Sequence, residues 1–542
     1  MKSNPTNGKV HSPLSTRASV LILTGVTLAL LAPFAGKAFH MDDPLFVWAA
    51  RHIQNDFADP YGFSVNWYGK IQPMWHVMKN PPLTSYYIAL AAFVVGWSEW
   101  ALHLAFLIPA IAASLGTFFL AKEFCSRPLE ATLAAILTPV FLISSTTIMC
   151  DVMMLAFWVW AIYLWVRGMQ TNRHGLLALA MLLVALSALT KYFGIALIPM
   201  LAIYSIASKK GWSWVLHLLI PVAILAGYQS VTQSLYGHGL LSDAAQYGKY
   251  YQSATGVHTA TQLASGLAFT GGCILLALFC APLLWTRKGL AIGLAVAGLA
   301  FIGFSLMPIG GLNPYGAAAV QFALMVSGGI GLLALAVADY IGRRDAGSLM
   351  LLLWVAGTFV FASVLNWSVN GRSILPMAPA AGILIIRRID RLHPKKNLMR
   401  YMYLSLTAAM LASLLIGYAD HQLAASARKA ACQITESYGD SQDIWFEGHW
   451  GFQYYMELKG GKAIAFKTFN PATGDLLILP SNNDTYMEPS VPPIDILSFE
   501  APLRLATMHP EVGAGFFAHV RGPLPFAIGD VPPEYYGVFE AP

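Results

Sequence analysis

Long stretches of apolar side chains are the feature that most restricts how this chain can fold. They recur up to residue 418, and most approach or exceed the roughly 20 residues that a helix needs to cross the hydrocarbon core of a bilayer. The apolar runs cover residues 19–38, 101–121, 131–149, 152–166, 176–190, 192–208, 214–233, 263–285, 289–308, 317–338, 348–365, 374–386 and 401–418. We therefore predict an all-α polytopic membrane protein with about thirteen transmembrane helices.

The composition excludes a soluble globular protein. Hydrophobic residues make up 56% of the chain and charged residues only 11%, against roughly 25% charged residues in an average soluble domain. The cysteines stand singly, at Cys125, Cys150, Cys273, Cys280 and Cys432. This spacing indicates neither a disulfide framework nor a cysteine-based metal site.

The distribution of basic residues predicts how the helices are oriented, because Lys and Arg near helix ends favour the cytoplasmic side. Alternate loops, beginning with residues 1–18 and ending with residues 387–400, contain most of the Lys and Arg residues. The opposite loops before residue 400 contain only Arg51, Lys70, Lys79, Lys191, Lys249 and Arg372, with Lys37 near the end of the first run. We therefore expect the N-terminus in the cytoplasm.

Three regions follow from these patterns. Residues 1–18 form a cytoplasmic tail, residues 19–418 a transmembrane domain with a large outer loop at 39–100, and residues 419–542 a soluble domain on the outer side. The apolar stretch 86–97 would reach only about 18 Å along a helix, too short for a bilayer core of about 30 Å. It is therefore interpreted as a juxtamembrane or re-entrant helix of the outer loop.

The last region has mixed periodicity. Residues 443–446 are expected to form a strand, 450–458 a helix, and 463–466 and 475–479 two further strands. This order predicts a small soluble α/β domain, and the prolines after residue 487 suggest an irregular end. The aromatic residues within 445–452 suit the core of such a domain better than a sugar-stacking surface, although aromatic rings can serve either purpose.

Acidic residues follow the first apolar run directly, in the sequence His40-Met41-Asp42-Asp43-Pro44. Pro44 suits the first turn of a helix, and Asp43 could simply cap that helix. This structural reading leaves Asp42 unexplained. Asp151, at the start of the fourth run, faces the same predicted side, where it could be either a functional carboxylate or a solvated turn residue.

Several basic residues lie on the side that should lack them. Lys79 and Asn80 precede a double proline, which forces an extended backbone and is equally consistent with a simple turn. Lys191 and Arg372 invite an anionic partner such as a phosphate at the membrane surface. A single lysine can also extend its ammonium to the surface without any partner.

The order of these motifs resembles the GT-C glycosyltransferases, and within them the bacterial branch related to protein O-mannosyltransferases and the lipid A aminoarabinose transferase. The resemblance covers roughly residues 19–390. It rests on Asp-Asp with Ala50-Arg51 following, Asn-Pro-Pro-Leu at 80–83, Asp151, Leu-Thr-Lys at 189–191 and Asn-Gly-Arg-Ser-Ile-Leu-Pro at 370–376.

The resemblance implies a GT-C fold and an enzyme that moves a sugar from a polyprenyl-phosphate carrier to an acceptor hydroxyl on a lipid, glycan or protein. It also implies the bacterial inner membrane, with catalysis and the C-terminal domain on the periplasmic face, and no nucleic-acid partner. By resemblance Asp42 is the general base, and Asp43 stands where Glu is usual. Asp151 is the second acidic position.

The donor-binding positions depart from the family pattern. Asn80 stands where Lys or His usually contacts the carrier phosphate, so Lys79 takes that role or the role is lost. Arg372 is followed by Ser373 rather than an aromatic residue, which puts a donor contact by residue 373 in doubt. Some relatives bind a divalent metal, for which His40, His76 and His103 would be the available ligands, but we assign no metal site.

The chemistry of these residue types agrees with sugar transfer. A hydroxyl nucleophile needs a base within hydrogen-bond reach, and cations stabilise the negative charge that develops on a leaving phosphate. The sequence contains no glycine-rich phosphate loop after a strand. The alternative hypothesis is a multi-span lipid or solute transporter or flippase, for which internal repeats and broken helices would be typical.

Overall fold

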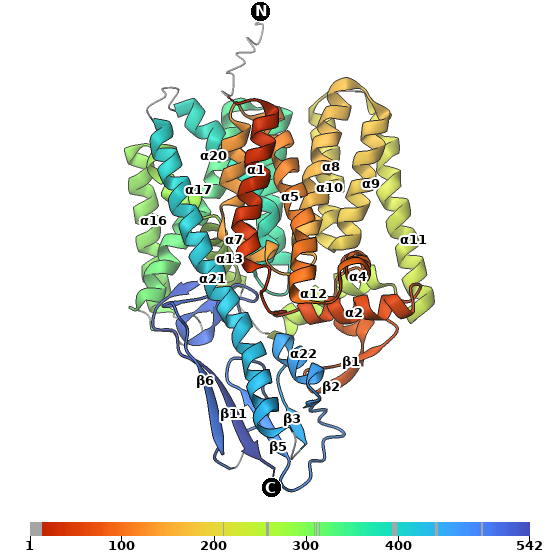
Figure 1. Ribbon diagram of the computed structural model, residues 1–542. Helices are drawn as coiled ribbons and strands as arrows, with labels where there is room; N and C mark the ends of the chain where they lie inside the picture. Colours follow the sequence, from red (N-terminus) through yellow and green to blue (C-terminus); the bar gives the residue numbers. More distant parts are fainter. Residues whose placement is uncertain are drawn as a thin grey trace, which may run out of the picture.

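The computed structural model contains a bundle of helices with a smaller mixed domain at one end (Figure 1). It describes residues 14–541 except 210, 256–258, 308, 310–311, 314, 393–397, 440–442 and 489–490. The side chains of residues 249–255 are also outside the description. Most of the predicted tail 1–18 and the basic residues Lys210, Lys395 and Lys396, together with the side chain of Lys249, therefore lie outside the described residues.

Eight helices in the described part of the chain are long and apolar enough to cross a membrane. They are α1 (Thr16–Leu31), α5 (Glu99–Phe124), α8 (Asp151–Thr171), α11 (Leu219–Tyr236) with the preceding η3 (Trp212–Leu218), α16 (Arg287–Leu306), α17 (Ala317–Arg343), α18 (Ala346–Val360) with η4 (Phe361–Leu365), and α21 (Met399–Tyr438). The chain is a multi-pass membrane protein, as predicted.

The predicted number of about thirteen spans is not confirmed, because several apolar runs form short or interrupted helices. The run 131–149 contains α6 (Pro128–Ile136) and α7 (Pro139–Ser145), which are bent by 66° relative to each other. Pro139 has no backbone N–H for a continuous helix, and the Thr138 hydroxyl instead accepts the Phe141 N–H at the start of α7. The expectation of unbroken helices is thus wrong here.

The remaining runs give shorter elements. They form α9 (His174–Thr190), η2 (Tyr192–Ala196), α10 (Leu197–Ala207), α13 (Thr259–Cys273), α14 (Leu276–Phe279), α15 (Ala281–Leu284), α19 (Gly371–Ile374), η5 (Leu375–Met377) and α20 (Ala378–Leu392). Glycine and proline interrupt several of these runs, which explains why apolar composition alone overestimated their continuity.

Loops that are rich in basic residues meet at one end of the bundle. The Lys122 ammonium donates to the Thr16 hydroxyl at 3.1 Å, which places the end of α5 beside the start of α1. At the ends of other helices Arg127 pairs with Asp390 at 3.3 Å and Arg167 pairs with Glu123 at 3.5 Å. The C-terminal domain lies at the opposite end (Figure 1).

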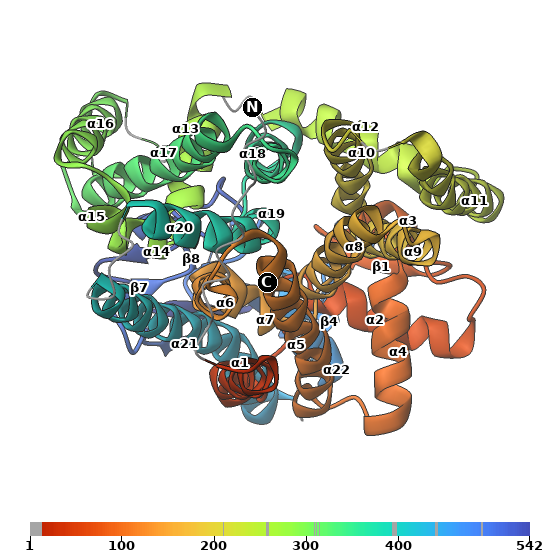
Figure 2. The ribbon, with the colours of Figure 1, turned by 90° about the horizontal axis from the view of Figure 1, so that it is seen from above.

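The outer loop forms its own small layer between the bundle and the C-terminal domain. It contains α2 (Asp43–Asn55), β1 (Ser64–Trp67), β2 (Lys70–Pro73), α3 (Met74–Val77) and α4 (Leu83–Val95). Helices α2 and α4 lie across the end of the bundle rather than along it (Figures 1 and 2). Apolar side chains such as Leu90 and Phe93 on α4 are exposed, as expected for a juxtamembrane helix.

The C-terminal domain has a five-stranded sheet in the order β4-β3-β5-β11-β6. These strands are β3 (Ile444–Phe446), β4 (Lys462–Ala463), β5 (Leu476–Pro480), β6 (Asp495–Phe499) and β11 (Glu534–Glu540), and α22 (Trp450–Leu458) follows β3. Strand β3 is parallel to β4 and β5, whereas β11 is antiparallel to β5 and β6. The predicted helix and α/β character are confirmed.

Two local expectations for this domain are wrong. The strand predicted at 463–466 ends at Ala463, and the chain after residue 487 contributes β6 and β11 to the sheet instead of an irregular end. Shorter strands also occur there, namely β7 (Leu505–Ala506), β8 (Met508–His509), β9 (Ala514–Gly515) and β10 (Ala527–Ile528). Phe446 and Phe452 are buried, which supports the core interpretation of residues 445–452.

A single helix connects the bundle to the C-terminal domain. Helix α21 runs for 40 residues, or about 60 Å at 1.5 Å per residue, which is twice the thickness of a bilayer core. The expected domain boundary at residue 419 therefore falls inside this helix. Helix α22 packs against α21.

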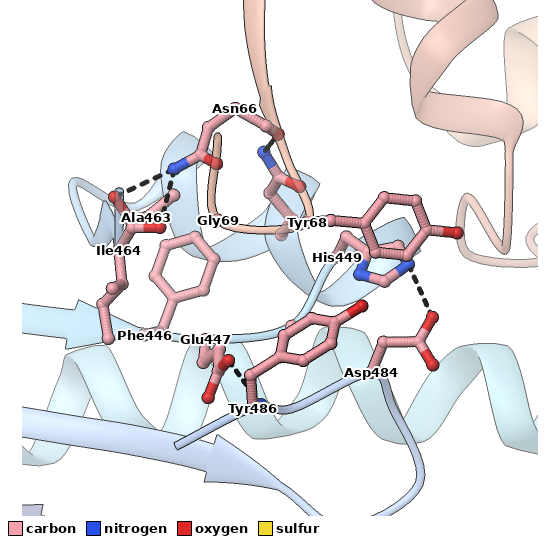
Figure 3. Close-up of a pocket in the computed structure, with 12 residues that line it drawn as sticks. Asn66, Tyr68, Gly69, Phe446, Glu447, His449, Ala463, Ile464, Asp484 and Tyr486 are labelled. Atoms are coloured by element: carbon pink, nitrogen blue, oxygen red, sulfur yellow. Dashed lines mark hydrogen bonds and ion pairs between the residues drawn. The ribbon is translucent and has the colours of Figure 1, made fainter. Parts of the chain in front are cut away.

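The β1–β2 hairpin fixes the outer loop to the C-terminal domain (Figure 3). The Asn66 amide donates to the Ala463 and Ile464 carbonyls at 3.2 and 2.9 Å, and Gly69 O accepts the Phe466 N–H at 3.0 Å. The cavity between them is only about 10 Å³, which is enough for about one water molecule. This contact is therefore a packed interface and not a ligand site.

Candidate active site

Four of the predicted residues meet in one charged cluster at the end of the bundle that faces the C-terminal domain. An Arg372 guanidinium nitrogen donates to Asp42 Oδ2 at 2.9 Å, and the other terminal nitrogen lies 4.0 Å from Asp151 Oδ2. The Lys191 ammonium donates to Asp151 Oδ1 at 2.6 Å. The cluster thus joins residues that are up to 330 positions apart in sequence.

Each member of this cluster stands at the end of a helix. Asp42 directly precedes α2, Asp151 begins α8, Lys191 follows α9, and Arg372 lies in the short helix α19. The Asn370 side chain caps α19 by accepting the Ser373 N–H at 2.9 Å. Helix ends at one level of a bundle bring polar side chains together without placing them in the hydrocarbon core.

Access to solvent varies across the cluster. The Asp151 side chain is 0% exposed, Lys191 and Arg372 are 16% and 13% exposed, and Asp42 is 33% exposed. An external molecule would therefore meet Asp42 first, with the two cations behind it and Asp151 at the bottom. Asp151 is the buried carboxylate, and it lies close to both Lys191 and Arg372. Because a buried charge without an opposite charge is costly, Asp151 keeps the two cations near it.

Asp43 differs from Asp42 in its surroundings although the two are adjacent. Asp43 is fully buried, and its two carboxylate oxygens accept the His40 N–H at 2.8 Å and the Ile148 N–H at 3.0 Å. Burial raises its pKa to about 7, partly opposed by these hydrogen bonds. Asp43 therefore ties the first outer loop to the segment before α8, whereas Asp42 is partly exposed to solvent.

Lys79 and Asn80 lie outside the charged cluster. The Lys79 ammonium is 5.1 Å from the centre of the Tyr247 ring of α12 (Leu240–Thr255), and burial lowers its pKa. The Asn80 carbonyl accepts the hydroxyl of Tyr61 at 2.8 Å. Tyr61 was not identified from the sequence, and its own burial raises its pKa.

An apolar cavity of about 230 Å³ opens beside these residues. It lies between the outer loop, α9 and α11, close to Leu189 and Pro82. Its lining includes Tyr61, Tyr86, Tyr228 and Tyr236 together with leucine, valine and proline side chains. Leu189 is two residues before Lys191, so the cavity and the charged cluster both involve residues at the C-terminal end of α9. An apolar cavity next to cations suits an amphiphile with an anionic headgroup.

A second buried ion pair supports the start of the outer loop. The Lys37 ammonium donates to an Asp420 carboxylate oxygen, and both side chains are fully buried. The other oxygen of Asp420 accepts the Thr507 hydroxyl at 2.9 Å and lies 3.7 Å from His40 Nε2. Sequence reasoning noted Lys37 only as a basic residue on the wrong side. The ion pair could have been predicted from the sequence, because Lys37 and Asp420 are opposite charges at the outer ends of the first and last apolar runs.

The histidines considered as metal ligands lie apart. His40 is near Asp420, His76 Nδ1 contacts Gln72 at 3.0 Å, and His103 Nδ1 contacts the Glu99 carbonyl at 2.8 Å. Within the described ranges, no group of three or more His, Cys, Asp or Glu side chains could hold a metal ion.

Comparison with known proteins supports the relationship that the motifs suggested. Residues 79–231 match the family model of dolichyl-phosphate-mannose-protein mannosyltransferases. That resemblance is confirmed. The matched segment includes Lys79, Asn80, Asp151 and Lys191. A comparison with curated proteins gives no match.

Solved structures that match this chain include two at low sequence identity. One is ArnT from Cupriavidus metallidurans bound to undecaprenyl phosphate, at 13% identity, with 86% of this chain and 94% of that chain covered and a TM-score of 0.46. The other is arabinosyltransferase EmbB from Mycobacterium smegmatis, at 15% identity, with 93% and 48% covered and a TM-score of 0.31.

Proposed function

We propose that the protein is a membrane glycosyltransferase that moves a sugar from a polyprenyl-phosphate carrier to an acceptor hydroxyl. The contact between Arg372 and Asp42, beside the Asp151–Lys191 pair, is the observation that carries this proposal. It joins a solvent-accessible carboxylate to two cations at the end of the bundle that faces the C-terminal domain. The family match of residues 79–231 adds a donor class, since the matched model is named for dolichyl-phosphate-mannose.

The proposed reaction is a single displacement at the anomeric carbon of the sugar. The acceptor oxygen forms a bond to this carbon, the bond from the carbon to the phosphate oxygen breaks, and the electron pair remains on polyprenyl phosphate. Asp42 takes the proton of the acceptor hydroxyl. Asp42 suits this role better than Asp43, because both oxygens of Asp43 already accept backbone N–H groups.

The cations stabilise the leaving group. The donor is a phosphodiester with one negative charge, and the released polyprenyl phosphate gains a second charge as the bond breaks. Arg372 and Lys191 therefore interact more strongly with the transition state than with the bound donor. Their contacts with Asp42 and Asp151 hold them in place before the donor arrives.

We place the first part of the polyprenyl chain in the tyrosine-lined cavity. This cavity has an apolar lining that includes Leu189 and Pro82, and we place the phosphate of a lipid bound there toward Lys191. Asn80 and Lys79 then lie along the approach of the carrier. Lys79 is in a position to attract the anionic headgroup but is held at Tyr247 in the free protein.

The proposed topology follows the distribution of basic residues. We place the start of α1 in the cytoplasm and the charged cluster, the outer loop and the C-terminal domain in the periplasm of a bacterial inner membrane. The short helices that complete the bundle, such as α9 and α10, would bring the number of membrane-embedded segments to about thirteen.

The test is an assay with a polyprenyl-phosphate sugar whose sugar is radiolabelled. Purified protein in detergent with an envelope lipid extract as acceptor should release polyprenyl phosphate and transfer the label. Arg372→Gln should lower kcat by at least about 100-fold. The matched control is Arg504→Gln, which removes an arginine from an exposed ion pair with Asp530 in the C-terminal domain and should leave the rate unchanged.

The transporter hypothesis predicts a different outcome. The bend between α6 and α7 is either a broken span or a re-entrant loop, and broken helices are typical of transporters. If labelled lipid-linked sugar crosses a proteoliposome membrane intact while no polyprenyl phosphate is released, the glycosyltransferase proposal is contradicted and the transporter hypothesis takes its place.

A further inference from the structure

A loop of the C-terminal domain contacts the segment that holds Arg372. The Phe516 carbonyl accepts the Gly371 N–H at 2.7 Å, and the His519 N–H donates to the Val369 carbonyl at 2.8 Å. These two hydrogen bonds pair residues 516–519 with residues 369–371, about 150 positions apart. The backbone at the start of α19 is thus fixed by a different domain.

The His519 side chain strengthens this contact. Its Nδ1 accepts the Val369 N–H at 3.1 Å and lies 2.9 Å from the Ser368 hydroxyl. The imidazole is buried, and burial lowers its pKa to about 4. His519 is therefore neutral at physiological pH. Because the Val369 N–H fixes Nδ1 as an acceptor, the Ser368 hydroxyl donates to the same nitrogen.

Residues 516–519 pack closely against the start of α19. A Cβ atom at Gly371 would lie 2.3 Å from the Phe516 ring, so the backbone approach requires glycine. The next residue, Phe517, places its ring centre 5.7 Å from the Arg372 guanidinium carbon. Its ring also meets the His40 imidazole edge to face at 5.2 Å. The guanidinium therefore has Asp42 on one side and an aromatic ring of the C-terminal domain close by.

We propose that the C-terminal domain orients Arg372 for its phosphate through the loop 516–519, with His519 as a positioning residue. This inference rests on the proposed sugar transfer and assigns a role to a domain whose contribution the sequence leaves open. His519 does not face the substrate; it acts through Val369 and the backbone that sets the direction of Arg372. An error of about 1 Å in such a group can lower a rate by about 100-fold.

The positioning of Arg372 by His519 is separable from the attachment of the C-terminal domain to the bundle. The C-terminal domain is attached by the continuous helix α21 and by the β1–β2 hairpin, where Asn66 and Gly69 make backbone contacts with residues 463–466. Loss of the His519 acceptor should therefore change the position of Arg372 while the domain stays attached.

The experiment measures kcat, the KM for the lipid-linked donor and the thermal midpoint of full-length protein in detergent. His519→Ala should lower kcat by about 10- to 100-fold. His519→Asn should recover much of this loss, because an asparagine side-chain oxygen can reach nearly the position of Nδ1 and accept the Val369 N–H. Phe517→Leu, which keeps every hydrogen bond of the loop, should lower kcat by a few fold.

The control is His509→Ala, which removes another buried histidine from the same domain. It should lower the thermal midpoint and change kcat little. A wild-type kcat in His519→Ala, or equal losses of kcat in His519→Ala and His519→Asn, overturns the inference. If His519→Ala does not fold, an unchanged kcat of Phe517→Leu overturns the inference instead. Wild-type protein that leaves the donor intact shows that the proposed function itself is wrong.

Discussion

Two Asp–cation pairs stand five residues apart at the start of the outer loop and differ in their access to water. Lys37 pairs with Asp420 across 383 positions, and Asp42 pairs with Arg372 across 330 positions. The first pair is 0% exposed on both sides, whereas Asp42 is 33% exposed and Arg372 13%. The same pairing of charges therefore occurs once in a closed environment and once in an open one.

The difference separates a structural pair from a chemical one. A sealed ion pair cannot exchange its partner for a ligand, and its loss leaves an uncompensated charge in the interior. An open pair can release its cation to an incoming phosphate and its carboxylate to an incoming hydroxyl. We infer that Lys37–Asp420 fixes the position of the loop, and that Asp42–Arg372 performs the reaction on it.

The largest change in stability should come from opening the sealed pair. Lys37→Met leaves Asp420 buried without its cation and should lower the free energy of unfolding by about 3–5 kcal/mol. Thermal unfolding in detergent measures this loss. The double variant Lys37→Met/Asp420→Leu should be more stable than Lys37→Met, because no buried charge remains. An unchanged midpoint for Lys37→Met would show that the sealed pair does not stabilise the loop.

A pH-dependent effect should come from Asp43, which is buried beside both pairs. Its pKa of about 7 in the folded protein lies above its ordinary value of 3.8, so the folded protein keeps a proton that the unfolded chain has lost. Stability should therefore fall as the pH rises from about 4 to about 7, by at most about 1.4 kcal/mol per pH unit. Above and below this window Asp43 adds no pH dependence.

The variant that isolates this titration is Asp43→Asn. Thermal midpoints of the wild type and Asp43→Asn across this range should diverge as the pH rises, with the wild type losing stability relative to the variant. The variant should start from a lower midpoint because its amide nitrogen cannot accept a hydrogen bond, but that offset does not change with pH. Parallel curves would mean that Asp43 is ionised throughout.

The smallest effect should come from a conservative change in the open pair. Arg372→Lys keeps the charge but cannot reach Asp42 and Asp151 at the same time, since an ammonium lacks the planar fork of a guanidinium. We expect kcat to fall by about 10-fold, with little change in the thermal midpoint. Steady-state rates with a saturating donor measure this fall in kcat. Full activity would show that only the charge of Arg372 matters.

Much of the fold was predictable because membrane spans and amphipathic elements have local signals. The runs that became α1, α5, α8, α16, α17, α18 and α21 were predicted, and α22 begins and ends at the predicted residues. The interrupted helices were not, because apolar composition does not reveal a break such as the one before Pro139. The strand β11 was missed because its partners lie far away in the sequence.

The residues of the site were also predicted only where they had a local signal in the sequence. Asp42, Asp151, Lys191 and Arg372 each stood out as a charge at an apolar boundary, and the structure brings these four together. Lys79 also stood out, but it lies at Tyr247. His519 and Phe517 gave no local signal, since their importance arises only from contact with residues about 150 positions earlier.

The central claim is that the open carboxylate is the base of a sugar transfer, and one variant tests it most directly. Asp42→Asn should be measured beside the wild type for release of polyprenyl phosphate and for its thermal midpoint. We predict a loss of turnover of about 100- to 10,000-fold, the range for removal of a general base, with a midpoint close to that of the wild type. Full turnover by Asp42→Asn would contradict the account.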